Sequence, residues 1–282
     1  MKTYSQEGGK VHESFLKAVV NIKVNNSSGT GFIVGVGKGK GKDRMFFLVT
    51  NKHMIGQWSM VDLFIPAKEI KVTLYRNNKN IHFFDITIPI SDSSNKLNEN
   101  VIVHPNPSVD VATIYLNDFL IGAGQVSFNN LDTSFLAPLD SIKKTTFIGL
   151  GSQVFALGYP ANIMITKSNE PIVKTGYIAS SFSGDLGMKE KWENKFKKSV
   201  AAVNNTKYFL VDGLIIPGNS GGPVLSPIIN TFYENGQIYY QDPPIQNRIL
   251  GIVSYIKPNT GICTVYAADY ILELIRNQIS KR

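Results

Sequence analysis

Short apolar runs, many of them alternating with polar residues, recur along the chain. Residues 70–74 alternate strictly, which is the period of a strand with one buried face. Similar runs span 15–24, 32–36, 45–50, 61–65, 70–75, 81–88 and 109–116 in the first part, and 153–157, 172–180, 208–211, 223–225, 238–240, 249–256 and 263–266 in the second. The pattern therefore predicts an all-β protein.

The strand-like runs fall into two groups of about six, which suits two antiparallel β-barrels because closure removes exposed sheet edges. We place one barrel at residues 1–133 and the other at 134–282, divided near a stretch that contains proline and serine. At the end of the chain, apolar residues 271, 272, 275 and 279 share one helical face, and Asp269 is suited to cap it. The prediction is thus two six-stranded barrels with a short C-terminal helix.

The run Gly218-Asn219-Ser220-Gly221-Gly222-Pro223 carries the clearest chemical signal. A serine hydroxyl becomes a nucleophile when a base takes its proton and hydrogen-bond donors receive the oxyanion. Flanking glycines allow positive φ and let a carbonyl approach the backbone amides. This predicts a nucleophile loop with its own oxyanion hole, whereas the plainer interpretation is a polar turn between strands.

The positions of the histidines restrict the hydrolase types, because all four precede Ser220: His12, His53, His82 and His104. The G-x-S-x-G elbow of α/β-hydrolases places its histidine after the serine, so that interpretation fails. A subtilisin-like order with His53 as base would leave only Asp43, in a lysine-glycine loop, as the orienting acid.

His53 is the preferred base, since it follows a buried strand-like run and rigid strand ends often hold catalytic groups. Asp110 is the preferred acid, because it opens an apolar run and a buried carboxylate needs a partner such as a histidine N–H. Asp85 and Asp118 are weaker rivals.

Together, these motifs resemble those of a known family. The pieces, in order, are Gly-Thr-Gly-Phe at 29–32, Leu-Val-Thr-Asn-Lys-His at 48–53, Asp-Val-Ala at 110–112, Val-Phe-Ala-Leu-Gly-Tyr-Pro at 154–160, Thr-Gly-Tyr-Ile at 175–178 and Pro-Gly-Asn-Ser-Gly-Gly-Pro at 217–223. They resemble the trypsin-like (chymotrypsin-fold) serine peptidases, most closely the bacterial branch that includes the HtrA/Deg proteases. The resemblance implies a His53–Asp110–Ser220 triad acting on protein or peptide substrates. Unlike in HtrA proteases, we expect no PDZ module in this sequence.

The resemblance also implies the surroundings of the nucleophile. It assigns the oxyanion hole to Gly218, Asn219 and Ser220, with the backbone N–H groups of Gly218 and Ser220 as the donors. It assigns substrate binding to Leu214, Ile215, Ile216, Ser254 and Tyr255, which favours apolar residues before the scissile bond. Animal trypsins have an aspartate in place of Asn219, so activation by a new N-terminus is not expected, and an activating partner protein is a further hypothesis.

Composition limits the remaining possibilities. Hydrophobic residues make up 43% of 282 residues, and the single cysteine, Cys263, excludes an intrachain disulfide. With no signal-like or membrane-spanning stretch, this predicts a cytoplasmic protein. No metal motif is present, and we expect no cofactor.

Two other functions stand beside the peptidase. The net charge of +8 includes lysine clusters at 38–42 and 189–198. Nucleic-acid binding through them is the least favoured function, because a solvated insertion explains the second cluster more simply. The main alternative to a peptidase is a latent or non-catalytic protease-fold module that binds a partner protein.

Overall fold

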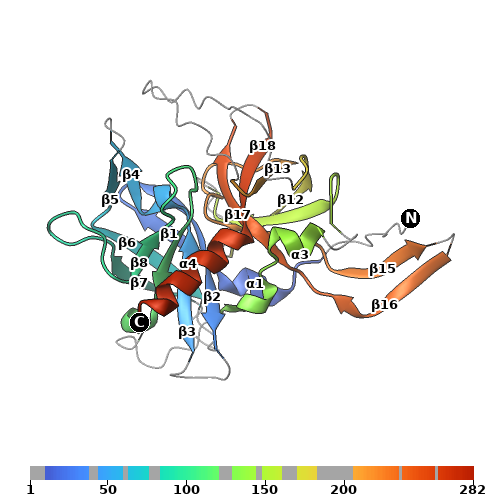
Figure 1. Cartoon of the computed structure of the whole chain (residues 1–282), viewed down its shortest axis with the longest axis horizontal. Helices are drawn as coiled ribbons and strands as arrows, with labels where there is room; N and C mark the ends of the chain where they lie inside the picture. Colours follow the sequence, from blue (N-terminus) through green and yellow to red (C-terminus); the bar gives the residue numbers. More distant parts are fainter. Residues whose placement is uncertain are drawn as a thin grey trace.

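The computed structural model describes residues 10–37, 44–59, 63–75, 83–120, 129–143, 148–160, 170–182, 206–234, 237–257 and 260–282. His82, Asp43 and both lysine clusters lie outside the described residues. Figure 1 shows two mostly β halves, one drawn in blue and green and the other in yellow-green to red, with the C-terminal helix crossing in front.

The first half is built on an eight-stranded sheet. Its strands are β1 (Val19–Val24), β2 (Ser27–Val36), β3 (Met45–Thr50), β6 (Glu69–Tyr75), β7 (Phe83–Pro89), β8 (Val101–Val103), β9 (Ala112–Tyr115) and β10 (Leu131–Asp132). The main path runs β7-β6-β1-β2-β3-β9-β8, and β10 pairs with β2 in parallel. β4 (Gly56–Trp58) and β5 (Phe64–Pro66) form a separate hairpin just after the strand end that carries His53.

The second half contains the closed six-stranded barrel that the sequence predicts. Its order is β11-β12-β13-β18-β17-β14. The bounds are β11 (Gln153–Gly158), β12 (Ile172–Ile178), β13 (Tyr208–Gly213), β14 (Pro223–Leu225), β17 (Ile249–Ile256) and β18 (Ile262–Ala267). A two-stranded arm, β15 (Ile229–Glu234) and β16 (Gln237–Ile245), projects away from this barrel (Figure 1).

The helices are few and mostly short. They are α1 (Glu13–Ala18), α2 (Asn117–Leu120), α3 (Leu139–Lys143) and α4 (Ala268–Ser280), with the 3-10 turns η1 (Lys52–Met54) and η3 (Thr133–Phe135). No helix in the described ranges is long and apolar enough to cross a membrane. The all-β class and the C-terminal helix are therefore confirmed.

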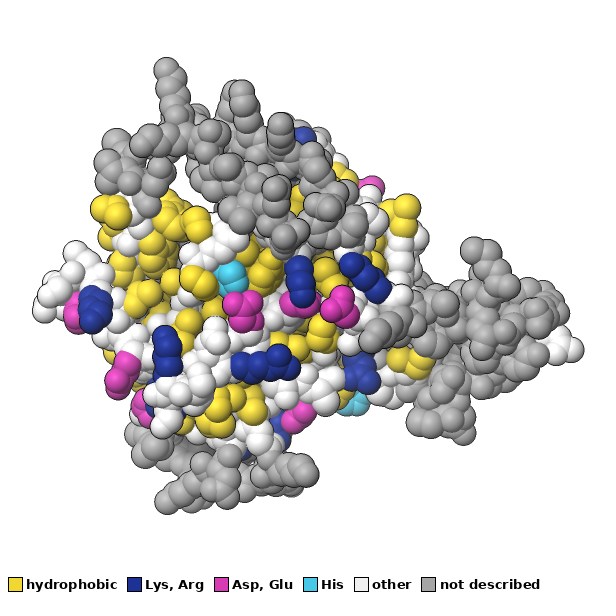
Figure 2. Space-filling view, in the orientation of Figure 1, with side chains coloured by type: hydrophobic (Ala, Val, Ile, Leu, Met, Phe, Trp, Pro, Cys, Tyr) yellow, Lys and Arg dark blue, Asp and Glu magenta, His cyan; other side chains and the backbone are white. Residues whose placement is uncertain are grey.

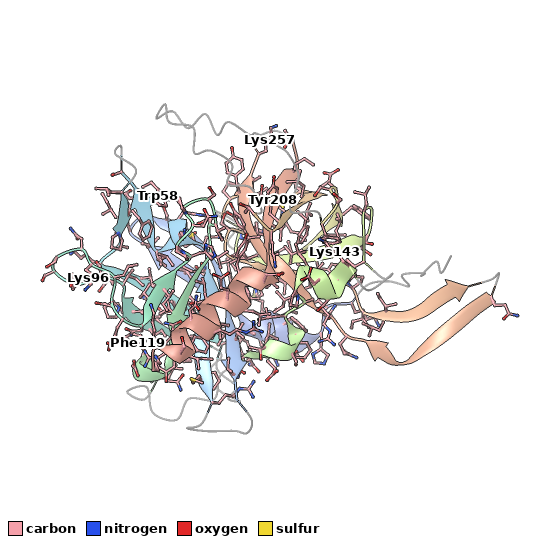
Figure 3. All side chains as sticks on the ribbon, in the orientation of Figure 1. Trp58, Lys96, Phe119, Lys143, Tyr208 and Lys257 are labelled. Carbon is pink, nitrogen blue, oxygen red and sulfur yellow. The ribbon has the colours of Figure 1, made fainter. Side chains whose placement is uncertain are left out.

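Three apolar clusters form the core. One fills the first half and one the second, while the third joins the halves beneath α4. In the joining cluster, Ile271 and Leu274 of α4 belong to the same set as Phe47 of β3 and Leu157 of β11. The side chains labelled in Figure 3 show the two halves on either side of this helix, with Trp58 in the first and Lys143 in the second. The two halves are thus packed together through one shared core.

Three details differ from the sequence-based prediction. The first sheet has eight strands and stays open in the described residues, because no pairing joins its edge strands β7 and β8. Residues 13–18 form α1 rather than the start of a strand. The N-cap of α4 is Ala267, and the Asp269 carboxylate instead accepts the Leu139 N–H and pairs with Lys207.

Candidate active site

His53 and Asp110, far apart in sequence, meet at one end of the first sheet. His53 lies in η1, directly after β3, and Asp110 lies two residues before β9, the strand that pairs with β3. The imidazole Nδ1 is 2.6 Å from Asp110 Oδ2, and the His53 backbone N–H donates to Oδ1 at 3.1 Å. Because the carboxylate holds Nδ1–H, the other ring nitrogen, Nε2, is left with the lone pair that a general base needs.

The two residues before His53 also bind the segment around Asp110. Asn51 Nδ2 donates to the Asp110 carbonyl at 2.6 Å, and Lys52 Nζ donates to the Asn106 carbonyl at 2.7 Å. Three successive residues therefore tie the base to the loop that carries the acid. Asn51 and Lys52 belong to the sequence motif that ends at His53, but the motif alone assigns them no function.

Ser220 lies in a loop whose backbone requires glycine. Gly218 and Gly221 have φ values of 96° and 87°, in the left-handed region. The Gly221 N–H donates to the Val253 carbonyl, and the Ser220 carbonyl accepts from the Thr30 N–H, both at 2.9 Å. The loop is therefore fixed against its own barrel on one side and against the first half on the other.

Thr30 of the first half also binds the Ser220 loop through its side chain, a role that its sequence motif does not reveal. Its hydroxyl donates to the Gly218 carbonyl at 2.7 Å and accepts the Tyr159 N–H at 2.9 Å. Its own carbonyl accepts from the Thr50 hydroxyl at 2.8 Å. The only sequence signal was its place between two glycines, where a small polar residue can approach another backbone closely.

Ser254 connects the nucleophile loop to the acid. Its hydroxyl donates to Asp110 Oδ2 at 2.6 Å, and its carbonyl accepts the Ser220 hydroxyl at 3.0 Å. A continuous series of hydrogen bonds thus runs from His53 through Asp110 and Ser254 to Ser220. Among these described residues, His53 and Ser220 share no direct hydrogen bond, because the serine hydroxyl points to the Ser254 carbonyl.

The backbone around Ser220 leaves two donors unused. Within the described part of the chain, the N–H groups of Gly218 and Ser220 donate to no protein acceptor, whereas the Asn219 N–H donates to the Ile216 carbonyl at 3.2 Å. The Asn219 side chain is fully buried, and neither its Oδ1 nor its Nδ2 has a partner among those residues. Two of the three predicted oxyanion residues are therefore free to donate.

The electrostatics of the pair suit proton transfer. Burial lowers the pKa of His53, but the Asp110 carboxylate outweighs burial and holds the pKa above its ordinary value. Burial raises the pKa of Asp110, but the imidazole and the hydrogen bonds from His53 and Ser254 outweigh it, so the pKa lies below its usual range. Asp110 therefore stays ionised and stabilises the imidazolium that forms when His53 takes a proton.

The predicted substrate-binding residues differ in exposure. Leu214 is 74% exposed and Tyr255 is 40% exposed, so both side chains are open to a ligand. Ile216 and Ser254 are half-buried and buried, respectively. Ile215 is only 3% exposed and packs in the core of the second barrel, so its contribution to a binding surface is limited to its backbone.

The other titratable residues considered for the site are engaged elsewhere or poorly suited to catalysis. Asp85 pairs with Lys71 at 2.7 Å, and Asp118 lies 3.5 Å from Arg282. His12 caps α1. Burial raises the pKa of the Cys263 thiol to about 12, so this cysteine is a poor nucleophile.

His104, the remaining described histidine, is buried with its ring edge-on to Tyr270 of α4. No group of His, Cys, Asp and Glu in the described ranges is arranged to hold a metal ion.

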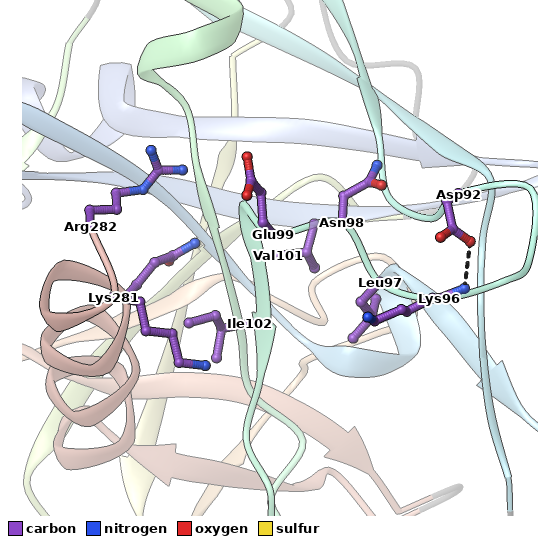
Figure 4. Close-up of a pocket in the computed structure, with 10 residues that line it drawn as sticks. Asp92, Lys96, Leu97, Asn98, Glu99, Val101, Ile102, Lys281 and Arg282 are labelled. Atoms are coloured by element: carbon purple, nitrogen blue, oxygen red, sulfur yellow. Dashed lines mark hydrogen bonds between the residues drawn. The ribbon is translucent and has the colours of Figure 1, made fainter.

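A cavity of about 610 Å³ lies apart from these residues, between the 92–99 loop, β8 and the end of α4 (Figure 4). None of the predicted site residues lines it. Of its cations, Arg282 already stacks on Tyr115 and contacts Asp118. On the face shown in Figure 2, basic and acidic side chains are interspersed, without a broad patch of one sign.

Comparisons with known proteins identify the family and the fold. The family model described as a trypsin-like peptidase domain matches residues 29–228. The fold is similar to that of an inactive-form serine-to-alanine mutant of Rv3671c from M. tuberculosis H37Rv, with 15% identity, a TM-score of 0.52, and 98% of this chain and 93% of that chain covered. The inactive form of the Rv3671c protease gives 16% identity, a TM-score of 0.49, and coverage of 94% and 90%. No curated protein matches the chain.

Proposed function

Because the chain belongs to the trypsin-like peptidase family, we propose that it is a serine endopeptidase with His53, Asp110 and Ser220 as its catalytic triad. The observation that carries the proposal is the 2.6 Å contact between His53 Nδ1 and the Asp110 carboxylate, which is linked through Ser254 to Ser220. This contact gives the imidazole the tautomer and orientation of a general base aimed away from the acid.

The proposed reaction begins with one side-chain rotation. The Ser220 hydroxyl leaves the Ser254 carbonyl and donates to His53 Nε2 as a peptide carbonyl arrives. Ser220 Oγ then attacks the carbonyl carbon while His53 takes the proton, and His53 later gives that proton to the leaving amine. Water repeats the sequence on the acyl-enzyme and releases the acid product.

The unused N–H groups of Gly218 and Ser220 would receive the oxyanion of each tetrahedral intermediate. One such donor typically contributes about 3–4 kcal/mol of transition-state stabilisation, so the glycine-dependent backbone matters as much as the triad. The exposed side chains of Leu214 and Tyr255 support a preference for apolar residues before the scissile bond. A peptide-library profile dominated by cleavage after Lys or Arg would contradict this preference.

The experiment that tests the triad is covalent labelling with a fluorophosphonate, read by intact mass. The purified chain should gain one adduct, and Ser220→Ala should gain none. Ser94→Ala is the matched control, because Ser94 lies in an exposed loop and, among the described residues, only its backbone N–H is hydrogen-bonded, to Asp92. Labelling that persists in Ser220→Ala would place the nucleophile elsewhere.

A latent or partner-binding module is the second candidate function. It is favoured by one observation, the engagement of the Ser220 hydroxyl by the Ser254 carbonyl rather than by His53. A folded chain that stays unlabelled would support it, and the next step would be to look for an activating partner protein.

We also propose a reducing, cytoplasmic location, on the basis of the single cysteine in the sequence. Cell fractionation with an antibody to the chain would test it. Recovery outside the cytoplasmic fraction would contradict it.

A further inference from the structure

Lys52, the residue before His53, is a buried cation. Its side chain is 3% exposed, and its Nζ donates to the Asn106 carbonyl at 2.7 Å. In the described part of the chain, no carboxylate forms an ion pair with it. Buried charges in proteins are normally paired, so this lysine costs stability that a neutral side chain of similar length would not.

The Asn106 carbonyl that Lys52 binds also closes the turn leading to Asp110. It accepts the Val109 N–H at 3.1 Å, and the Asn106 side chain accepts the Ser108 N–H at 2.9 Å. Lys52 therefore braces the start of this turn at Asn106, while Asn51 binds its end at the Asp110 carbonyl.

The charges around Lys52 come from three elements. Burial lowers the pKa of Lys52 to about 8, and the Asp110 carboxylate opposes that decrease. His104, after β8, is subject to burial and to the Lys52 charge, both of which lower its pKa, whereas Glu273 of α4 raises it.

The hydroxyls of Tyr266 in β18 and Tyr270 in α4 lie in the same region. Tyr266 donates to the Ser108 carbonyl, and burial raises the pKa of both tyrosines. They therefore stay neutral and do not offset the charges of Lys52 and Asp110.

We propose that Lys52 is a positioning residue, whose ammonium braces the turn that presents Asp110 and whose charge offsets part of the attraction of Asp110 for the His53 proton. This inference rests on the proposed function. Asp110 alone favours the protonated imidazolium, and a cation that interacts with the carboxylate offsets part of this preference. The base then remains unprotonated at a lower pH than it would beside an unbalanced carboxylate.

The test is an NMR titration of the His53 imidazole in isotope-labelled full-length protein, with His53→Gln to assign its signal. Four variants are compared with the wild type: Lys52→Met, Lys52→Gln, Lys52→Arg and Lys71→Met. The last is the matched control, because Lys71 is a lysine on β6 with a half-exposed side chain. We expect the His53 midpoint to rise by roughly half a unit or more in Lys52→Met and Lys52→Gln, and to stay in place in Lys52→Arg and Lys71→Met.

Lys52→Gln separates the bracing of the turn from the effect of the charge, since the glutamine amide can still donate to the Asn106 carbonyl. An unchanged His53 midpoint in folded Lys52→Met or Lys52→Gln would overturn the proposal. An equal rise in Lys71→Met would also overturn it, because net charge alone would then explain the effect.

The rate of fluorophosphonate labelling against pH supplies a second readout. The acid limb should move to higher pH in Lys52→Met by the same amount as the NMR midpoint. A wild-type protein that folds but is not labelled would contradict the proposed peptidase function, while the NMR titration would still decide the effect of Lys52.

Discussion

The first half of the molecule presents His53 and Asp110 through side-chain hydrogen bonds, whereas the second half presents Ser220 through its backbone. Four side-chain-mediated bonds join the segment 51–53 to the segment 106–110. The Ser220 loop depends instead on two glycines with positive φ and on backbone contacts to Thr30 and Val253. The comparison predicts two different outcomes. Loss of a hydrogen-bonding side chain in the first half should lower the rate of the chemistry, and added bulk at a glycine in the second half should destabilise the fold.

The largest expected effect tests the side-chain half. Asp110→Asn keeps the shape of the acid but removes the charge and favours the wrong imidazole tautomer. The rate of fluorophosphonate labelling should fall about 10⁴-fold with little change in thermal unfolding. Asp85→Asn, which alters an exposed ion pair on β7, is the matched control and should label at the wild-type rate. A decrease below tenfold in Asp110→Asn would remove Asp110 from the triad.

The next effect tests the backbone half. A Cβ on Gly221 would lie 1.9 Å from the Thr30 carbonyl oxygen, at a φ of +87°. Gly221→Ala should therefore lower the free energy of unfolding by about 3 kcal/mol or more, since strained φ alone costs about 1–3 kcal/mol. Urea unfolding measures the change. Gly149→Ala is the control, because a Cβ there meets no atom within 4 Å, and equal loss in both variants would refute the steric explanation.

A smaller effect is expected at the junction of the two halves. Thr30→Val keeps the side-chain shape but leaves the Gly218 carbonyl and the Tyr159 N–H without their partner. A typical hydrogen bond contributes about 0.5–1.5 kcal/mol, so the loss of both bonds should cost about 1–3 kcal/mol and lower both stability and labelling rate. Thr87→Val, at an exposed position of β7, should change neither. Normal labelling in Thr30→Val would show that the nucleophile loop does not need the Thr30 hydroxyl to hold its shape.

The sequence predicted those parts of the fold and site that depend on local pattern. Alternation at 70–74 gave β6, and the glycine-rich run gave the loop whose positive φ values the structure confirms. Contacts between residues far apart in the sequence could not be predicted from it, because local pattern does not determine how the two halves pack. Ser254 was predicted as part of a binding strand, and only the packing of β17 against the first half brings its hydroxyl to Asp110. The helical start of residues 13–18 was missed because an apolar run does not distinguish a short buried helix from a strand.

Ser254→Ala should give the smallest effect. It tests the comparison directly, because Ser254 lies in the second half but binds both Asp110 and Ser220. The substitution removes the hydroxyl that donates to Asp110 Oδ2 but keeps the carbonyl that accepts from Ser220. Asp110 retains both bonds from His53, so the loss should be about 1.5 kcal/mol, the lower end for a hydrogen bond to a charged group, or roughly a tenfold decrease in labelling rate. His53 should also titrate at higher pH, because the carboxylate loses a donor and attracts the imidazole proton more strongly. A loss as large as that of Asp110→Asn would instead mean that the second barrel, and not the loop around residue 106, orients the acid.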